Sequence, residues 1–253
     1  MRLTFLGTGT SQGVPMVGCR CRVCRSTDPR DKRLRTAALL ELDGATLMID
    51  AGPDFRTQLL REDVARLDAI LLTHEHTDHT GGLDDVRAFN HFMRCPMPVY
   101  AEERVQQALR RTFAYAFGAQ RYPGAPQIAQ HTIREGQAFE VQGVRVTPVR
   151  AMHAQLPVLG FRVKNLAYIT DANFVGSEAK QQLRGLDVLV LNALRREPHV
   201  SHFTLGEALQ LIAELKPAKA YLTHISHQMG LHAEVQPSLP HGVALAYDGL
   251  MLE

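Results

Sequence analysis

Short apolar stretches, set apart by glycine-rich or acidic turns, recur along this sequence and predict the strands of a sheet structure. In the first hundred residues they cover 3–6, 37–42, 45–50, 67–72 and the residues up to 100. The pattern resumes later and covers 139–149, 159–164, 166–171, 188–191, 220–224 and 242–252. Gln142 and Gly143 are typical of a tight turn, so the first of these later stretches is expected to be a hairpin.

Two segments show the spacing of amphipathic helices. Residues 102–116 repeat apolar side chains every three to four positions. Residues 204–215 do the same, and Thr204 followed three positions later by Glu207 is the capping-box signature of a helix start. Two series of strands with helices between them predict an α/β sandwich with the sheets inside and the helices outside, in a single domain over 1–253.

Composition limits the classes of protein to which the chain can belong. With 253 residues, 45% of them hydrophobic, it can bury a sizeable core, and neither disorder nor a fibre fits. The net charge of +2 gives no strong electrostatic reason for a polyanionic partner, so nucleic acid is neither required nor excluded. The first residues read as a strand rather than a signal peptide, and no apolar stretch approaches the roughly 18 residues of a membrane span. We therefore expect a cytoplasmic protein without membrane contact.

Four potential metal ligands follow the apolar stretch 67–72 within six positions. They are His74, His76, Asp78 and His79. Imidazole nitrogens and a carboxylate oxygen are donors that zinc, manganese and iron all accept. His74 and His76 lie two residues apart at a strand end and can point to one side, while Asp78 and His79 follow in the next turn. This density predicts a metal site, and one such loop can seat two ions. A polar turn with solvated histidines is the alternative.

A two-metal site needs more donors than one loop holds. Further candidates stand where later predicted strands end: His153, Asp171 and His224. Such positions are where a rigid scaffold usually carries functional side chains. Taken singly, each of the three also fits a strand-end cap or a surface residue.

Together these residues resemble the ligand set of the metallo-β-lactamase superfamily, in which an H-x-H-x-D-H loop is followed by His, Asp and His at later strand ends. The resemblance spans nearly the whole chain and implies a four-layer αββα sandwich with two divalent ions, zinc or manganese, in the active site. One metal would be held by His74, His76 and His153, the other by Asp78, His79 and His224, and Asp171 would bridge them. Asp50 matches the early aspartate of the superfamily and would orient a ligand histidine.

A second cluster of donors lies near the N-terminus. Cys19, Cys21 and Cys24 crowd into six positions, a spacing that favours thiolate ligation of a metal over a disulfide. Three reduced cysteines without a metal are the alternative.

This cluster and residues 5–15, which contain Gly-Thr-Gly-Thr, narrow the resemblance to one branch of the superfamily. That branch contains the cyclic phosphodiesterase of the carbon–phosphorus lyase pathway. The resemblance implies a structural zinc held by the three cysteines and His227, the second histidine of T-H-I-S-H-Q at 223–228. A Cys₃His set is closed, and closed sets build structure rather than catalyse. His232 is the other candidate for the fourth ligand.

The activity implied is hydrolysis of a small phosphodiester, cyclic or nucleotide-derived, by a hydroxide that bridges the two metals. Asp78 and Asp171 make the site rich in oxygen, which suits phosphate better than a lactam or a thioester. The leaving oxygen also needs a proton. His202 matches the general acid of the phosphodiesterase, and a histidine side chain ordinarily titrates near neutral pH. We therefore expect Asp78 and His202 to act in catalysis. His199 is the alternative proton donor.

Two other functions stay open. A nuclease that matures transfer RNA shares the Gly-Thr-Gly start and the histidine loop, but that branch usually lacks the cysteines and carries an arm that grips RNA. A non-catalytic metal-binding protein would keep the fold without turnover. The expected partner is a small phosphodiester rather than nucleic acid, and a homodimer is compatible with the sequence.

Three smaller expectations concern residues outside these sets. Gly7, Gly9 and Gly13 are expected to allow tight turns beside the site, because no helix pattern follows them as a nucleotide-binding loop requires. The mixed charge run 28–35 is expected to be a solvated loop. Cys95 is expected to be a small core residue.

Overall fold

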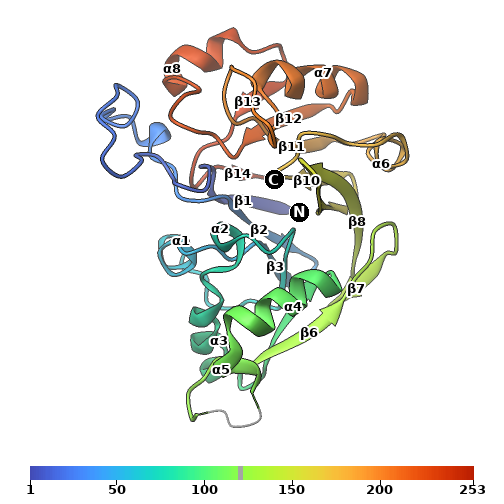
Figure 1. The fold of residues 1–253 in the computed structure, drawn as a ribbon. Helices are drawn as coiled ribbons and strands as arrows, with labels where there is room; N and C mark the ends of the chain where they lie inside the picture. Colours follow the sequence, from blue (N-terminus) through green and yellow to red (C-terminus); the bar gives the residue numbers. More distant parts are fainter. Residues whose placement is uncertain (119–121) are drawn as a thin grey trace.

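Two seven-stranded sheets form the centre of the computed structural model, which describes residues 1–118 and 122–253 (Figure 1). The first sheet has the strand order β14-β1-β2-β3-β4-β5-β6. Its strands are β1 (Arg2–Gly7), β2 (Ala37–Leu42), β3 (Ala45–Ile49), β4 (Ala69–Leu71), β5 (Met97–Ala101), β6 (Ile128–Thr132) and β14 (Met251–Leu252). Strands β3 to β6 run parallel, so the carboxyl ends of β3 and β4 meet at one edge of the sheet.

The second sheet has the order β13-β12-β11-β10-β9-β8-β7. Its strands are β7 (Phe139–Val141), β8 (Val144–His153), β9 (Leu156–Val163), β10 (Leu166–Ile169), β11 (Val188–Asn192), β12 (Lys219–Thr223) and β13 (Val243–Leu245). Strands β10 to β13 are parallel. All four residues of β10 are buried, as a parallel strand covered on both faces requires. The edge strand β6, in contrast, ends in two exposed residues.

Helices cover the outer faces of both sheets (Figure 1). On the side of the first sheet lie α1 (Phe55–Arg61), α2 (Thr77–Thr80), α3 (Arg87–Met93), α4 (Glu103–Thr112) and α5 (Ala114–Phe117). On the side of the second lie α6 (Ser177–Gln182), α7 (Leu205–Leu215) and α8 (His232–Val235). Short 3₁₀ turns complete the set: η1 (Pro29–Asp31), η2 (Leu83–Val86) and η3 (Gln236–Ser238). Within the described residues, no helix combines the length and the apolar character needed to cross a membrane.

Three apolar clusters fill the spaces between these layers. The middle cluster joins the sheets and includes Phe5 and Leu40 from the first and Phe161 and Tyr168 from the second. One outer cluster joins the first sheet to α1, α3 and α4, and the other joins the second sheet to α6 and α7. Burial of this apolar surface is the main force that holds the layers together. The predicted four-layer αββα sandwich is confirmed.

Two predictions that rest on neighbouring residues, the hairpin and the capping box, are confirmed. The hairpin turns at Gln142 and Gly143, between β7 and β8. The capping box of Thr204 and Glu207 starts α7. The helix predicted over 102–116 is wrong in extent, because Phe113 leaves helical geometry (φ −111°, ψ 42°) and separates α4 from α5. Its ring is buried in the outer cluster, so packing of the aromatic side chain competes with continuation of the helix.

The strand predicted over 242–252 is also wrong in extent. It divides into β13, which pairs with β12, and β14, which pairs with β1 in the other sheet. The chain turns between them at Gly249, whose φ of 85° suits glycine. Asp248 in this turn accepts hydrogen bonds from the backbone amides of Thr8 and Leu34, and these long-range bonds fix the turn.

The charge run 28–35 is not a solvated loop, contrary to expectation. Asp31 and Arg33 are only 2% and 5% exposed. The Arg33 guanidinium donates to the Thr8 hydroxyl at 2.8 Å and to the Ala246 carbonyl oxygen at 2.6 Å. The run therefore ties the N-terminal loop to the end of the second sheet, because its buried charges find partners distant in sequence.

Candidate metal centre

The loop after β4 brings four of the predicted ligands to the edge where both sheets end. It turns into α2 at Thr77 and lies against the loop after β3, where the Ala51 amide donates to the His79 carbonyl oxygen at 2.7 Å. Gly52 permits this close approach, because a Cβ atom there would lie 2.0 Å from the Asp78 carbonyl oxygen. The position of the ligand loop is thus fixed by its neighbour in the first sheet.

His74, His76 and His153 form the first donor group, with ligand nitrogens within 4.8 Å of one another. His153 ends β8 and comes from the second sheet. Its Nδ1 donates to the Ser201 carbonyl oxygen at 2.8 Å, and His74 Nδ1 lies 2.9 Å from the Thr73 hydroxyl. The Ser201 carbonyl oxygen can only accept, so it fixes the proton of His153 on Nδ1. The Thr73 hydroxyl donates to Asp50 and can therefore accept from His74 Nδ1. Both rings then have the Nε2 lone pair available for an ion.

Asp78, His79, Asp171 and His224 form the second donor group. Asp171 follows β10 and His224 follows β12, so the second sheet supplies half of the group. Asp171 Oδ2 lies 3.3 Å from His79 Nε2 and 3.2 Å from His224 Nε2. The same oxygen lies 4.0 Å from His74 Nε2 of the first group. Its position between both groups is the geometry that a bridging carboxylate needs.

The chemistry of these donors fits divalent ions. His79 Nε2 and both nitrogens of His224 are buried and form no hydrogen bond with any of the described residues. Buried polar atoms of this kind are costly unless a ligand satisfies them. The backbone gives a second indication of a functional site, because Asp171 and His224 both have a φ of 55°. Left-handed backbone is uncommon for residues with a side chain and clusters at functional sites.

Asp50 supports the centre from behind and is completely buried. Its carboxylate accepts hydrogen bonds from the Thr73 amide and the Thr73 hydroxyl, each at 2.9 Å, and from His79 Nδ1 at 2.7 Å. The histidine that Asp50 contacts is therefore His79. A proton held on Nδ1 leaves the lone pair on Nε2, the nitrogen that faces Asp78 and Asp171.

The charges of the second group depend on one another. Burial alone would lower the pKa of His79, but Asp171 and Asp50 outweigh it and raise that pKa well above its ordinary value. Burial would likewise raise the pKa of Asp171, yet His224 and His79 hold it well below its usual range. The pKa of Asp78 is also lowered, because its contact with His79 overcomes burial. The carboxylates thus stay ionised, and their negative charge would be balanced by bound divalent ions.

His202, the predicted proton donor, lies against both groups. Its ring stacks on His153 with centroids 4.5 Å apart, and its Nε2 lies 3.9 Å from Asp171 Oδ2. His153, Asp171 and His202 also form a group that could hold an ion, a role the sequence did not suggest. Burial, with His224 adding to it, lowers the pKa of His202 to about 3. His199 packs against His202 at 5.1 Å but belongs to none of the donor groups found among the described residues.

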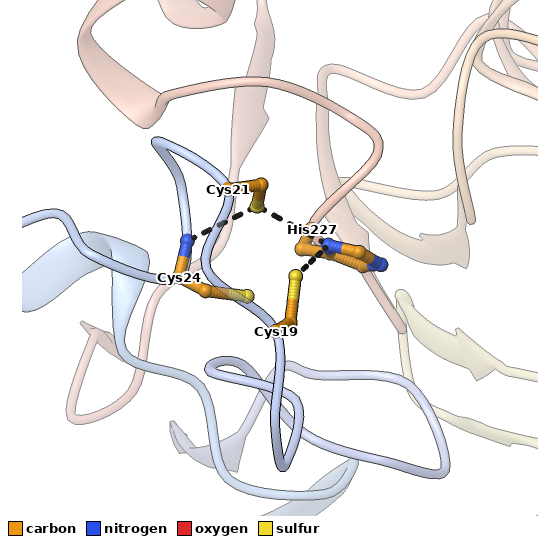
Figure 2. Close-up of side chains that lie close together, drawn as sticks. All are labelled: Cys19, Cys21, Cys24 and His227. Carbon is orange, nitrogen blue, oxygen red and sulfur yellow. Dashed lines mark hydrogen bonds between the residues drawn. The ribbon is translucent and has the colours of Figure 1, made fainter.

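The three predicted cysteines and His227 converge on one point (Figure 2). His227 Nδ1 lies 3.4 Å from Cys19 Sγ and 3.3 Å from Cys21 Sγ. The Cys24 amide donates to Cys21 Sγ at 3.4 Å, and this bond, aided by His227, lowers the pKa of the Cys21 thiol to about 6. Burial raises the pKa of Cys24. Three sulfurs and one imidazole nitrogen are the donor set of a closed tetrahedral zinc site.

Two residues considered from the sequence lie elsewhere. His232, the other candidate for the fourth ligand, is buried beside the charge run, where its amide donates to Asp31 at 2.8 Å. His232 is therefore not part of the cysteine cluster, and His227 is the histidine that joins the three cysteines. Cys95 is exposed rather than in the core, contrary to expectation, because it lies in the short surface link between α3 and β5.

Sequence reasoning missed the supporting partners Thr73 and Ser201. Thr73 directly precedes the histidine loop, so its position was a usable signal. Ser201 contributes a backbone carbonyl oxygen, which no side-chain pattern can reveal.

Comparison with known proteins identifies the family. Residues 45–225 match the model of the β-lactamase superfamily domain. The chain belongs to this superfamily. The structure of a new diphosphatase from the PhnP family matches with a TM-score of 0.93 and 41% identity, over 100% of this chain and 97% of that one. The chain is a metallo-β-lactamase hydrolase of PhnP type, and the resemblance seen in the sequence is confirmed.

Two other relatives match this chain over only about half of their own length. An octanoyltransferase from Porphyromonas gingivalis is 42% identical over 99% of this chain and 51% of its own length, so the chain spans about half of that relative. A ribonuclease Z from Bradyrhizobium diazoefficiens is 29% identical over 63% of this chain and 48% of its own length. The nuclease branch is therefore a more distant part of the superfamily.

Proposed function

We propose that this protein is a metal-dependent phosphodiesterase that hydrolyses a small phosphodiester, cyclic or nucleotide-derived, at a two-metal centre. The observation that carries the proposal is the position of Asp171 Oδ2 between two groups of histidines. One ion is assigned to His74, His76 and His153, and the other to Asp78, His79 and His224. The match to a PhnP-family diphosphatase supports chemistry at phosphorus.

Two bound ions, zinc or manganese, would lower the pKa of a water molecule and stabilise negative charge on phosphoryl oxygens. The residues of the chain prepare the centre for this chemistry. Asp50 holds the proton of His79 on Nδ1, and the Ser201 carbonyl oxygen does the same for His153. The ionised Asp78 and Asp171 supply oxygen donors, which suit a substrate rich in oxygen.

His202 is the proposed donor of a proton to the leaving oxygen. In the free protein burial lowers its pKa to about 3, so the role requires a bound anion that favours the charged ring. A phosphoryl group beside Asp171 would provide such a charge next to His202 Nε2. His199 is the alternative donor, since its ring packs on His202.

The cysteine cluster is proposed to hold one structural zinc, because four donors close its coordination. The expected partner stays a small phosphodiester in the cytoplasm, with nucleic acid not favoured, no membrane contact and a homodimer left open.

Release of p-nitrophenolate from bis(p-nitrophenyl) phosphate by metal-loaded protein tests the proposal. We expect measurable turnover that His76→Ala lowers at least about 100-fold, because a metal ligand is lost. His91→Ala is the matched control, since His91 lies exposed on α3. Absence of turnover with both ions bound would favour the non-catalytic alternative. Preferred cleavage of precursor transfer RNA would favour the nuclease.

A further inference from the structure

Arg104 contacts the loop that carries the candidate metal ligands but has no part in the centre described so far. It is the second residue of α4. Its Nη1 donates to the carboxylate of Glu75, which stands between His74 and His76 in the chain. Its Nη2 donates to the Pro157 carbonyl oxygen at 2.6 Å. One guanidinium therefore joins the ligand loop of the first sheet to β9 of the second.

Pro157 lies close to the third ligand of the first donor group. It faces Met152 across the antiparallel pair of β8 and β9, and the next pair joins Leu156 to His153. This pairing makes β9 move with the strand that ends in His153. Arg104 thus connects the ligand loop to the strand that carries the third ligand.

The ligand loop and β9 also meet directly, at one earlier point. There the Leu159 amide donates to the Thr73 carbonyl oxygen at 3.0 Å. Two residues further along each segment, at Glu75 and Pro157, the side chain of Arg104 forms the link instead. The bridge through Arg104 therefore extends the connection between the two sheets as far as the metal ligands.

His76 is the ligand that depends most on this bridge. It is exposed, whereas His74 and His153 are buried. Among the described residues its ring has a hydrogen-bond contact with His74 Nε2, at 2.9 Å, and His74 is itself a ligand. The second half of the loop has a separate support, because the Ala51 amide donates to the His79 carbonyl oxygen. Loss of the bridge should therefore affect the first donor group and spare the second.

The helix that carries Arg104 is itself fixed in place. Val105 and Leu109 are 0% and 1% exposed and belong to the outer cluster of the first sheet. Glu102, the residue before α4, accepts a hydrogen bond from Arg150 Nη1 of β8 at 3.0 Å. A planar guanidinium bonds two acceptors in fixed directions. Arg104 therefore holds its two acceptors at a defined spacing.

We propose that Arg104 is a positioning residue: by joining Glu75 to Pro157 it sets the distance between the ligand loop and His153, and thereby the affinity of the first donor group for its ion. The inference rests on the proposed function, because it takes the assignment of one ion to this group as given. Positioning and charge alone predict opposite signs. Arg104 repels a bound cation, so by charge alone its removal would raise the affinity, whereas loss of positioning lowers it.

Arg104→Met tests the proposal, since methionine keeps an unbranched apolar chain but lacks the guanidinium. Each donor group is measured alone, the first in a His224→Ala background and the second in a His153→Ala background. Cobalt titration of chelator-treated protein gives each affinity, and the absorption of cobalt–thiolate bonds counts ions in the cysteine cluster separately. We expect Arg104→Met to weaken the first site about 10- to 100-fold, as for other residues that orient metal ligands. The second site should stay within about twofold of its parent.

Two further variants separate positioning from a general loss of structure. Arg104→Lys should restore part of the affinity, because an ammonium can still pair with Glu75 but lacks the fork of donors. Arg110→Met is the matched control, since Arg110 lies on the same helix and its carboxylate neighbour is Glu103, at 3.9 Å. It should leave both sites within about twofold of their parents. Unchanged or tighter binding at the first site in Arg104→Met, or equal losses at both sites, would overturn the inference.

Turnover of bis(p-nitrophenyl) phosphate by fully loaded wild-type protein is measured separately from these affinities. Weaker binding at the first site in Arg104→Met, together with no hydrolysis by wild type, would leave the positioning role standing and reject the proposed function. Unchanged affinity in Arg104→Met, together with an active wild type, would reject the positioning role and leave the proposed function standing.

Discussion

Replacing Asp50 with asparagine should weaken metal binding while the fold stays intact. Asparagine tolerates the left-handed backbone at this position, where φ is 61°. It also keeps one acceptor oxygen, but its amide nitrogen can only donate. Because Asp50 accepts two bonds from Thr73 and one from His79 Nδ1, one donor loses its acceptor. With the amide nitrogen facing His79, the imidazole proton moves to Nε2, and the nitrogen that faces the centre can no longer bind an ion.

The expected size of this effect is a loss of about 10- to 100-fold in affinity for one of the two ions, typical of residues that orient a ligand histidine. This corresponds to about 1.4 to 2.8 kcal/mol. Competition against a chromophoric chelator measures the affinity of each ion, and a melting curve of the metal-free protein checks the fold.

Asp68→Asn is the matched control. Asp68 is also buried, and it accepts hydrogen bonds from the Thr46 amide and from Arg66 at the far end of β4. It should change stability without changing metal affinity. Wild-type affinity for both ions in Asp50→Asn, or the same loss in both variants, would refute the role of Asp50.

Four further outcomes are expected. His202→Ala should keep both ions and lower kcat by about 10² to 10⁴-fold on a diester with a poor alkoxide leaving group. The loss should be far smaller with p-nitrophenolate, because this group leaves without a proton. Equal losses on both substrates would refute the proton-donor role. Asp171→Ala should reduce the content of both ions in elemental analysis and abolish turnover, and a variant with both ions and near-normal turnover would exclude a bridge. Cys21→Ser should release only the structural zinc and lower the melting temperature. In chelator-treated protein at pH 7, iodoacetamide should modify Cys21 before Cys24, since the Cys21 thiol, with a pKa of about 6, is mostly ionised there, whereas burial raises the pKa of Cys24.

The parts of this protein that sequence could predict are those encoded locally. The ligand loop holds four donors in six positions, and its strand is a short apolar run. His153, Asp171 and His224 were found because each directly follows a strand pattern, and strand ends carry functional residues. The structure brings all three to the loop, since β4, β8, β10 and β12 end on the same side of the sandwich.

The parts that sequence could not predict depend on contacts between distant segments. Arg33 and Asp31 look like solvated charges until Thr8, Ala246 and His232 provide buried partners. The division of 242–252 into two strands likewise depends on which sheet each half reaches. In the same way, His202 reaches Asp171 because the Phe203 amide donates to the Ala172 carbonyl oxygen at 2.7 Å, and no spacing in the sequence encodes this contact.

The donors of the centre come from both sheets, so the spacing between the two halves of the sandwich sets the distances between the donors. His74 and His79 move with the first sheet, and Asp171 and His224 move with the second. A shift of one sheet relative to the other would change these distances. The packing of the apolar layer between the sheets therefore controls the geometry of the metal centre. A substitution deep in that layer can therefore alter metal affinity without touching a ligand, and bound ions would in turn clamp the two halves together.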